Sequence, residues 1–124
     1  MKSAAPLLDL SAISLSGLCI LHCLALPFAA VALPILGGLA EAEWAHAAFV
    51  AAAAPIAAAA LIDWRGGSTA WSLVAAAALG LGLMGAGAAG WPTEAAETPL
   101  TVAGGVILAF AHAANWRRRH QAPR

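Results

Sequence analysis

The chain has 124 residues, of which 62% are hydrophobic and only 10% charged, and its formal net charge is zero. About a quarter of the residues in soluble domains are charged, so this composition argues against a soluble protein. It shows no basic or acidic run large enough to indicate a nucleic-acid partner. We therefore expect a single domain over residues 1–124 that is embedded in a lipid bilayer.

Four segments contain no charged side chain, and they cover residues 10–40, 44–62, 66–93 and 98–116. The shortest has about 19 residues and would form a helix about 28 Å long, close to the thickness of a bilayer core. Lipid offers no partner to unpaired backbone groups, which favours helices. The sequence predicts an all-α membrane protein, a bundle of four transmembrane helices at about residues 8–38, 44–62, 69–90 and 98–116.

Charge indicates the orientation, because four spans put every Lys and Arg on one side. These residues are Lys2, Arg65, Arg117, Arg118, Arg119 and Arg124, while Glu41, Glu43, Glu94 and Glu97 fall in the opposite loops. The positive-inside rule then places both termini in the cytoplasm. All five tryptophans stand at predicted helix ends, where indole rings prefer the headgroup level: Trp44, Trp64, Trp71, Trp91 and Trp116. A cleaved signal peptide is the alternative for the N-terminus, but Asp9 and His22 interrupt that pattern.

The first span holds the most distinctive side chains. It is too long for one straight crossing and contains Pro27 and Pro34, so we expect a kink near these prolines. Cys19, His22 and Cys23 occupy positions i, i+3 and i+4, which lie on one face of a helix. The same stripe continues toward the cytoplasm through Ser16 and Asp9.

Two thiols beside an imidazole indicate a site for a soft metal ion. Thiolate and imidazole are ligands for Hg(II), Zn(II) and Cu(I) rather than for hard cations such as magnesium. Two thiolates and one divalent ion sum to zero charge, which a low-dielectric interior tolerates best. The metal is expected as a substrate or ligand, with no permanent cofactor. The alternative is that the cysteines are small core residues and His22 donates to a nearby carbonyl group.

The second and fourth spans carry further polar residues. His46 is predicted at the outer end of the second span, and His112 and Asn115 share one face at the inner end of the fourth. Together with Asp9 they form a candidate pathway on either side of the Cys19, His22 and Cys23 cluster. The alternative is that His46 and Asn115 are ordinary interfacial residues.

The third span carries a ridge of small residues at every fourth position, formed by Ala78, Gly82, Ala86 and Gly90. Small residues at this spacing let helices approach closely. We expect the ridge to pack inside the bundle, and the alternative is that it is a face for a homo-oligomer.

Several of these segments resemble the MerC-type mercury-resistance membrane proteins and their relatives. The similar segments are residues 18–23 (LCILHC) with 25–27 (ALP), 43–46 (EWAH) with Pro55, and 100–105 (LTVAGG) with 112–115 (HAAN). The resemblance implies a bacterial inner-membrane protein that takes up mercuric ion, with cysteines of the first span as ligands. The chain departs from the mercury transporter because a histidine interrupts its cysteine pair and because it lacks a second, cytoplasmic pair.

We expect no enzyme, because no nucleotide-binding loop and no nucleophile paired with a base is recognisable. Three interpretations remain open. The first is uptake or transfer of a soft heavy-metal ion, the second is a membrane subunit that binds or senses metal without transport, and the third is a structural helix bundle. The sequence specifies neither the metal, the direction of its movement nor the oligomeric state.

Overall fold

The computed structural model describes residues 4–33, 43–62 and 69–121 of the chain. Its elements are α1 (Ala4–Ala32), α3 (Glu43–Leu61), α4 (Trp71–Ala88), the short 3-10 helix η2 (Glu94–Ala96) and α5 (Glu97–Gln121). The four α-helices are all long and apolar enough to cross a membrane. The predicted fold class, an all-α bundle of four membrane-spanning helices, is confirmed.

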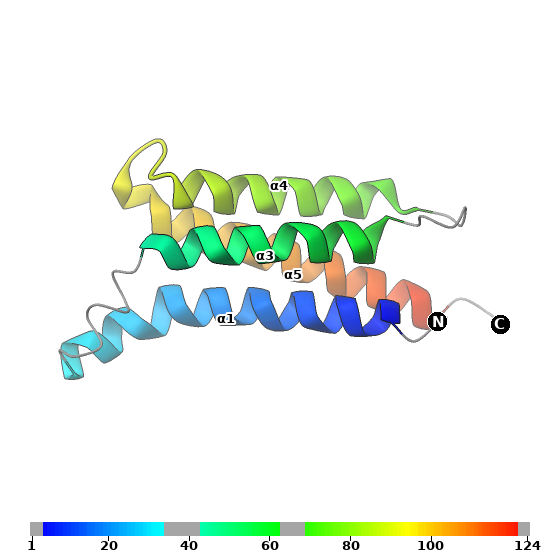
Figure 1. The fold of residues 1–124 in the computed structure, drawn as a ribbon, viewed down its shortest axis with the longest axis horizontal. Coiled ribbons are helices and arrows are strands. Elements are labelled where there is room, and N and C mark those ends of the chain that lie inside the picture. The colour runs from blue at the N-terminus through cyan, green and yellow to red at the C-terminus, as the bar shows by residue number, and fades with distance from the viewer. Residues whose placement is uncertain (1–3, 34–42, 63–68, 122–124) are drawn as a thin grey trace.

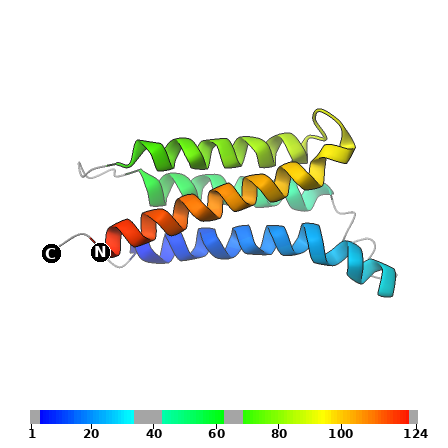
Figure 2. The same ribbon diagram turned by 180° about the vertical axis from the view of Figure 1, so that it is seen from behind.

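The four helices lie side by side, and α5 crosses obliquely behind α3 in Figure 1. It packs against both α4 and α1, while α3 covers the other side of α1 and α4. Helices α1 and α4 begin, and α3 and α5 end, at the same end of the bundle (Figures 1 and 2). We name this the basic end because α5 carries Arg117–Arg119 there. The opposite end, with Glu94 and Glu97, is the acidic end.

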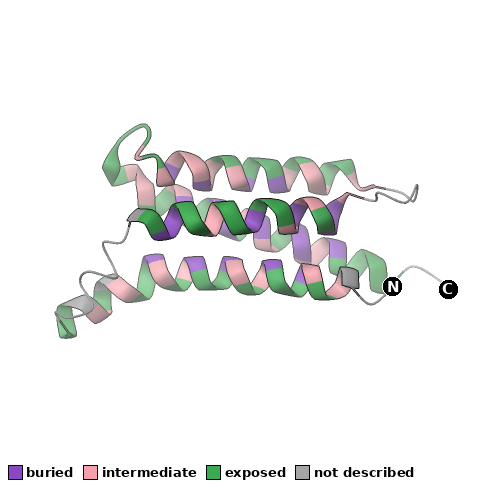
Figure 3. Ribbon diagram, viewed as in Figure 1, coloured by how far each residue is buried: buried purple, intermediate pink, exposed green. Residues whose placement is uncertain are grey.

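The side chains are distributed as lipid requires rather than as water requires. Large apolar residues such as Leu21, Phe28 and Phe110 are exposed, whereas the interior holds small residues together with Asp9 and His112 (Figure 3). Apolar side chains gain little by leaving lipid, but polar groups gain hydrogen bonds inside the bundle. The exposed tryptophans at helix ends, Trp44, Trp71, Trp91 and Trp116, agree with their expected position at the headgroup level.

Helix α1 ends at Ala32, earlier than the predicted span. Its last turns, cyan in Figure 1, run away from the other three helices. The kink near Pro27 and Pro34 stays a prediction, and Pro34 lies outside the described residues. So do Lys2, Glu41, Trp64, Arg65 and Arg124.

The closest helix contact joins α4 and α5 through glycines. A Cβ atom on Gly80 would lie 2.8 Å from the Gly104 carbonyl oxygen, and one on Gly104 would collide with the Gly80 carbonyl oxygen. The residues of α4 that face the bundle are therefore Ala77, Gly80, Met84 and Gly87. Only residues without a bulky side chain permit this backbone approach.

The expectation that the ridge of Ala78, Gly82, Ala86 and Gly90 packs inside the bundle is wrong. Ala78 and Gly82 are exposed, and a Cβ atom on Gly82 would meet nothing within 4 Å. Gly90 has a different role, because its φ of 65° lets it end α4. Its N–H bonds to the Gly87 carbonyl and the Trp91 N–H to the Ala86 carbonyl, which is a Schellman motif.

Candidate functional site

A buried seam between α1 and α5 contains most of the polar side chains of the interior. On α1 its members are Asp9, Ala12, Ser16, Cys19 and Cys23, spaced alternately by three and four residues. The buried residues of α5 are Thr101, Gly104, Gly105, Leu108, Ala111, His112 and Asn115, of which Gly104 and Leu108 contact α4. These spacings keep one face of each helix toward its neighbour. The polar members form one cluster near each end of the seam.

The cluster toward the acidic end contains the two cysteines. Cys19 and Cys23 are both buried, are one helical turn apart and carry free thiols. The face that the sequence predicted for the two cysteines is thus turned into the bundle.

His46 on α3 joins this cluster directly. Its Nε2 atom lies 3.1 Å from Cys23 Sγ, and its Nδ1 atom lies 2.6 Å from Glu97 Oε1 on α5. An ionised carboxylate can only accept, so Nδ1–H donates to Glu97 and the Nε2 lone pair faces the sulfur. This pattern, a histidine oriented by a carboxylate, is typical of metal ligands. His46 therefore lies beside the cysteines instead of forming a separate outer position.

Glu97 and Thr101 are members of this cluster that the sequence did not predict. Thr101 Oγ1 lies 3.6 Å from Cys23 Sγ and donates to the Glu97 backbone carbonyl at 2.6 Å. The sequence predicts Glu97 only as an acidic residue of a loop. The spacing of Glu97 and Thr101 on one helix face was the only available signal, and it does not indicate which neighbouring helix the face meets.

His22 lies next to the cluster but is turned toward α3. Its ring centroid is 5.2 Å from that of His46 and 6.0 Å from that of Phe49, both in edge-on arrangements. Its Nε2 atom is buried and has no hydrogen-bond partner in the described part of the chain. His22 lines an otherwise apolar cavity of about 400 Å³, whose other walls are Leu15, Trp44, Ala45, Ala48, Phe49 and Ala52.

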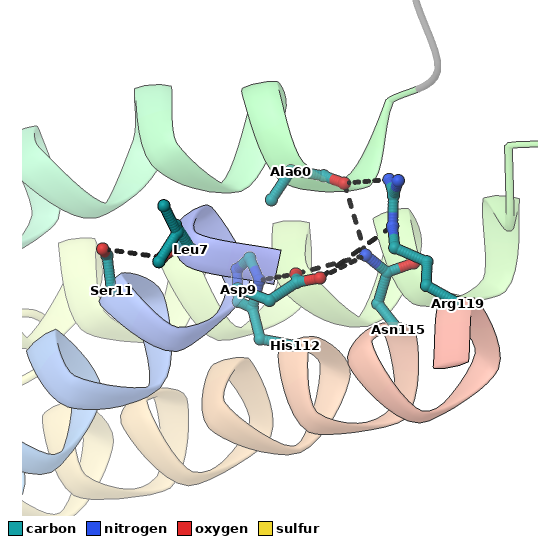
Figure 4. A network of polar contacts seen from close by, with 7 residues as sticks. All are labelled: Leu7, Asp9, Ser11, Ala60, His112, Asn115 and Arg119. Atoms are coloured by element: carbon teal, nitrogen blue, oxygen red, sulfur yellow. Dashed lines mark hydrogen bonds and ion pairs between the residues drawn. The ribbon is translucent and has the colours of Figure 1, made fainter. Parts of the chain in front are cut away.

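The second cluster lies toward the basic end and is centred on Asp9 (Figure 4). His112 Nδ1 is 2.9 Å from Asp9 Oδ1, and Asn115 Nδ2 is 3.1 Å from Oδ1 and 3.0 Å from Oδ2. Arg119 Nε lies 3.9 Å from Oδ2. Asn115 and Arg119 also donate to the Ala60 carbonyl oxygen of α3, at 3.3 and 2.7 Å.

The two clusters are well separated along the seam. Asp9 and Cys23 are both on α1, and at the helical rise per residue they lie about 21 Å apart along its axis. The candidate pathway residues are thus divided. His46 belongs with the cysteines, whereas Asp9, His112 and Asn115 contact one another at the other end.

This arrangement lies within a known family. A family model described as MerC mercury resistance protein matches residues 9–117, a stretch that contains the cysteine cluster and, of the second cluster, Asp9, His112 and Asn115. The chain belongs to the MerC family. The resemblance inferred from the sequence is confirmed, and with it the association with mercury resistance and with membranes. No curated protein and no solved structure gives a significant match.

The cysteine cluster of this MerC-family chain offers few ligands. Among the residues that the structure describes, no three His, Cys, Asp or Glu side chains are gathered so as to hold a metal ion. The cluster contains two sulfur atoms on α1 and one imidazole nitrogen, His46 Nε2, beside Cys23. A site of this kind suits an ion that is satisfied by two or three soft ligands.

Proposed function

We propose that this MerC-family protein binds mercuric ion between Cys19 and Cys23 and transfers it across the bacterial inner membrane. The observation that carries the proposal is the buried cysteine pair with His46 Nε2 at 3.1 Å from Cys23 Sγ. The family association with mercury resistance supports the choice of ion. No catalytic residue is assigned, because binding and release of an ion need no covalent change in a substrate.

The number of ligands favours mercuric ion over zinc. Mercuric ion can be held by two sulfur ligands, whereas zinc in structural sites is bound by four ligands. The described side chains supply two thiols and one oriented imidazole, and His22 would have to turn from α3 to become a fourth ligand. Charge agrees with this choice, since two thiolates neutralise a divalent ion and leave no net charge in the membrane interior.

The proposed orientation sets the order in which an ion that enters from outside would meet these residues. With the basic end in the cytoplasm, the cysteine cluster lies in the outer half of the membrane, next to the acidic end. An ion from outside would meet His46 and the cysteines first. It would then move along the α1–α5 seam toward Asp9, His112 and Asn115.

Metal titration of the purified protein in mild detergent tests the site. Cys19→Ser and Cys23→Ser are each expected to abolish tight binding of mercuric ion, with the double variant little worse, because one sulfur cannot hold the ion. Affinity is expected to rise with pH, because the ion displaces thiol protons. Ser14→Ala, at an exposed position of α1, is the matched control and should bind like the parent. Parent-like binding by both cysteine variants would refute the site.

Accumulation of mercuric ion in cells separates transfer from binding alone. Cells that produce the parent protein are expected to accumulate more ion than cells that produce Cys23→Ser at equal protein level. Equal accumulation, combined with normal binding by the purified parent, would instead support a membrane subunit that binds or senses metal.

A further inference from the structure

The Asp9 cluster is poorly suited to a metal cation. The buried carboxylate accepts hydrogen bonds from His112 and Asn115, and Arg119 adds a positive charge 3.9 Å from Oδ2. A metal ion would reach the Asp9 oxygens only by displacing these donors and approaching the guanidinium group. The presence of carboxylate and imidazole at this end of the seam therefore needs another explanation.

His112 has one ring atom that these contacts leave unused. Its Nδ1 atom lies against the Asp9 carboxylate, so Nε2 is the ring nitrogen that this contact leaves available to a proton. His112 is completely buried, and in the segments that the structure describes its Nε2 atom has no hydrogen-bond partner. A single lone pair can bind a proton, whereas a metal ion needs further ligands.

Within residues 4–33, 43–62 and 69–121, few other groups lie near this pair. Asp9 and Arg119 balance in charge, and Asn115 is neutral. Helix α3 contributes the Ala60 carbonyl oxygen, while its Glu43 and His46 lie at the acidic end, and α4 contains no titratable side chain. Among the described groups, an added proton on the His112 ring therefore leaves the cluster with a net positive charge.

We propose that Asp9 and His112 form a proton-binding site, and that its proton hinders the passage of a metal cation at the basic end. Repulsion between like charges is strong in a low-dielectric interior, so the protonated cluster would oppose a cation that leaves the seam. The effect on passage rests on the proposed transfer of metal, but proton binding by the pair does not.

Nuclear magnetic resonance of protein with isotope-labelled histidine, in detergent, tests proton binding directly. The ring nitrogens of His112 are expected to change protonation state within the pH range in which the protein stays folded. Asp9→Asn should change the pH at which this happens, while His120, an exposed histidine of the same helix, keeps its parent behaviour. A His112 ring that stays in one state throughout that range overturns the proposal, whether or not the variant folds.

Vesicles with the two sides held at different pH values test the effect on metal. Acid on the side of the basic end is expected to slow transfer of radioactive mercuric ion by ~5-fold or more in the parent, as like-charge repulsion predicts. His112→Gln should lose this response and still bind one ion per cysteine site, and His120→Gln should respond like the parent. An equal response in parent and His112→Gln overturns the coupling. Parent-like binding by Cys19→Ser would instead refute the metal site and leave the resonance result standing.

Discussion

His46 connects three helices, because its ring on α3 lies between Cys23 of α1 and Glu97 of α5. The Nδ1 contact with the carboxylate fixes which nitrogen carries the proton. It also fixes the direction in which Nε2 points. Glu97 thus acts on the cysteine cluster through His46 and is a positioning residue in the proposed site.

Glu97→Ala is expected to weaken mercuric ion binding by about 10-fold, the lower end of the range for partners of a metal-binding histidine. Glu97→Gln should lose less affinity, because its amide oxygen can still accept the His46 proton. Glu94→Ala, at an exposed acidic residue of η2, removes the same charge without touching the site. Titration of the three purified variants with mercuric ion measures these affinities. A loss in Glu94→Ala as large as in Glu97→Ala would indicate a general effect of charge instead.

Part of this residue-scale description could be predicted from sequence. The spacing of Asp9, Ser16, Cys19 and Cys23 indicated one stripe, and these residues are buried together. The contact between Cys23 and His46 could not be predicted, because it depends on the rotation and register of α3 against α1. Periodicity within one helix carries no information about either quantity.

At the scale of the helices, the sequence also did not determine which face of α4 packs against its neighbour. Small residues occur all round this helix, so two stripes of Ala and Gly satisfy the spacing for close packing. The four-residue spacing favours the stripe that contains Ala78 and Gly82, whereas the stripe that contains Gly80 and Gly87 packs against α5. The matching glycine on the partner helix, Gly104, decides between them, and that pairing appears only when the two helices are placed together.

A pair of glycine variants measures this contact. Gly104→Ala is expected to destabilise the bundle by about 1–3 kcal/mol, because the added Cβ atom would collide with the Gly80 carbonyl oxygen and Met84. Gly82→Ala adds the same atom at an open position and should be neutral or stabilising by up to about 1 kcal/mol, since alanine favours helix. Thermal unfolding in detergent, followed by circular dichroism, compares them. Equal unfolding temperatures would contradict the α4–α5 packing described above.

At the scale of the whole molecule, the lipid environment explains why the architecture was predictable. A bilayer requires long segments without charge, and the 18-residue spans Trp44–Leu61 and Trp71–Ala88 fall within such segments. The same environment places polar side chains inside, so Asp9, Cys19, Cys23 and His112 are buried where α1 and α5 meet. The order of these residues along the seam could be determined only from the structure. Soft ligands lie near the acidic end and a carboxylate lies near the basic end.

The orientation of the bundle is the last expectation to test, since the direction of metal transfer depends on it. Helices α1 and α4 begin at the basic end and α3 and α5 end there, so both termini and the α3–α4 connection should share one compartment. The positive-inside rule predicts from the basic residues of these regions that this compartment is the cytoplasm. Reporters that work only in the cytoplasm should be active when fused after Arg65 or Arg124, and inactive when fused after Glu41 or Glu97. Activity after Glu97 would contradict the four-span orientation and, with it, the outer position of the cysteine cluster.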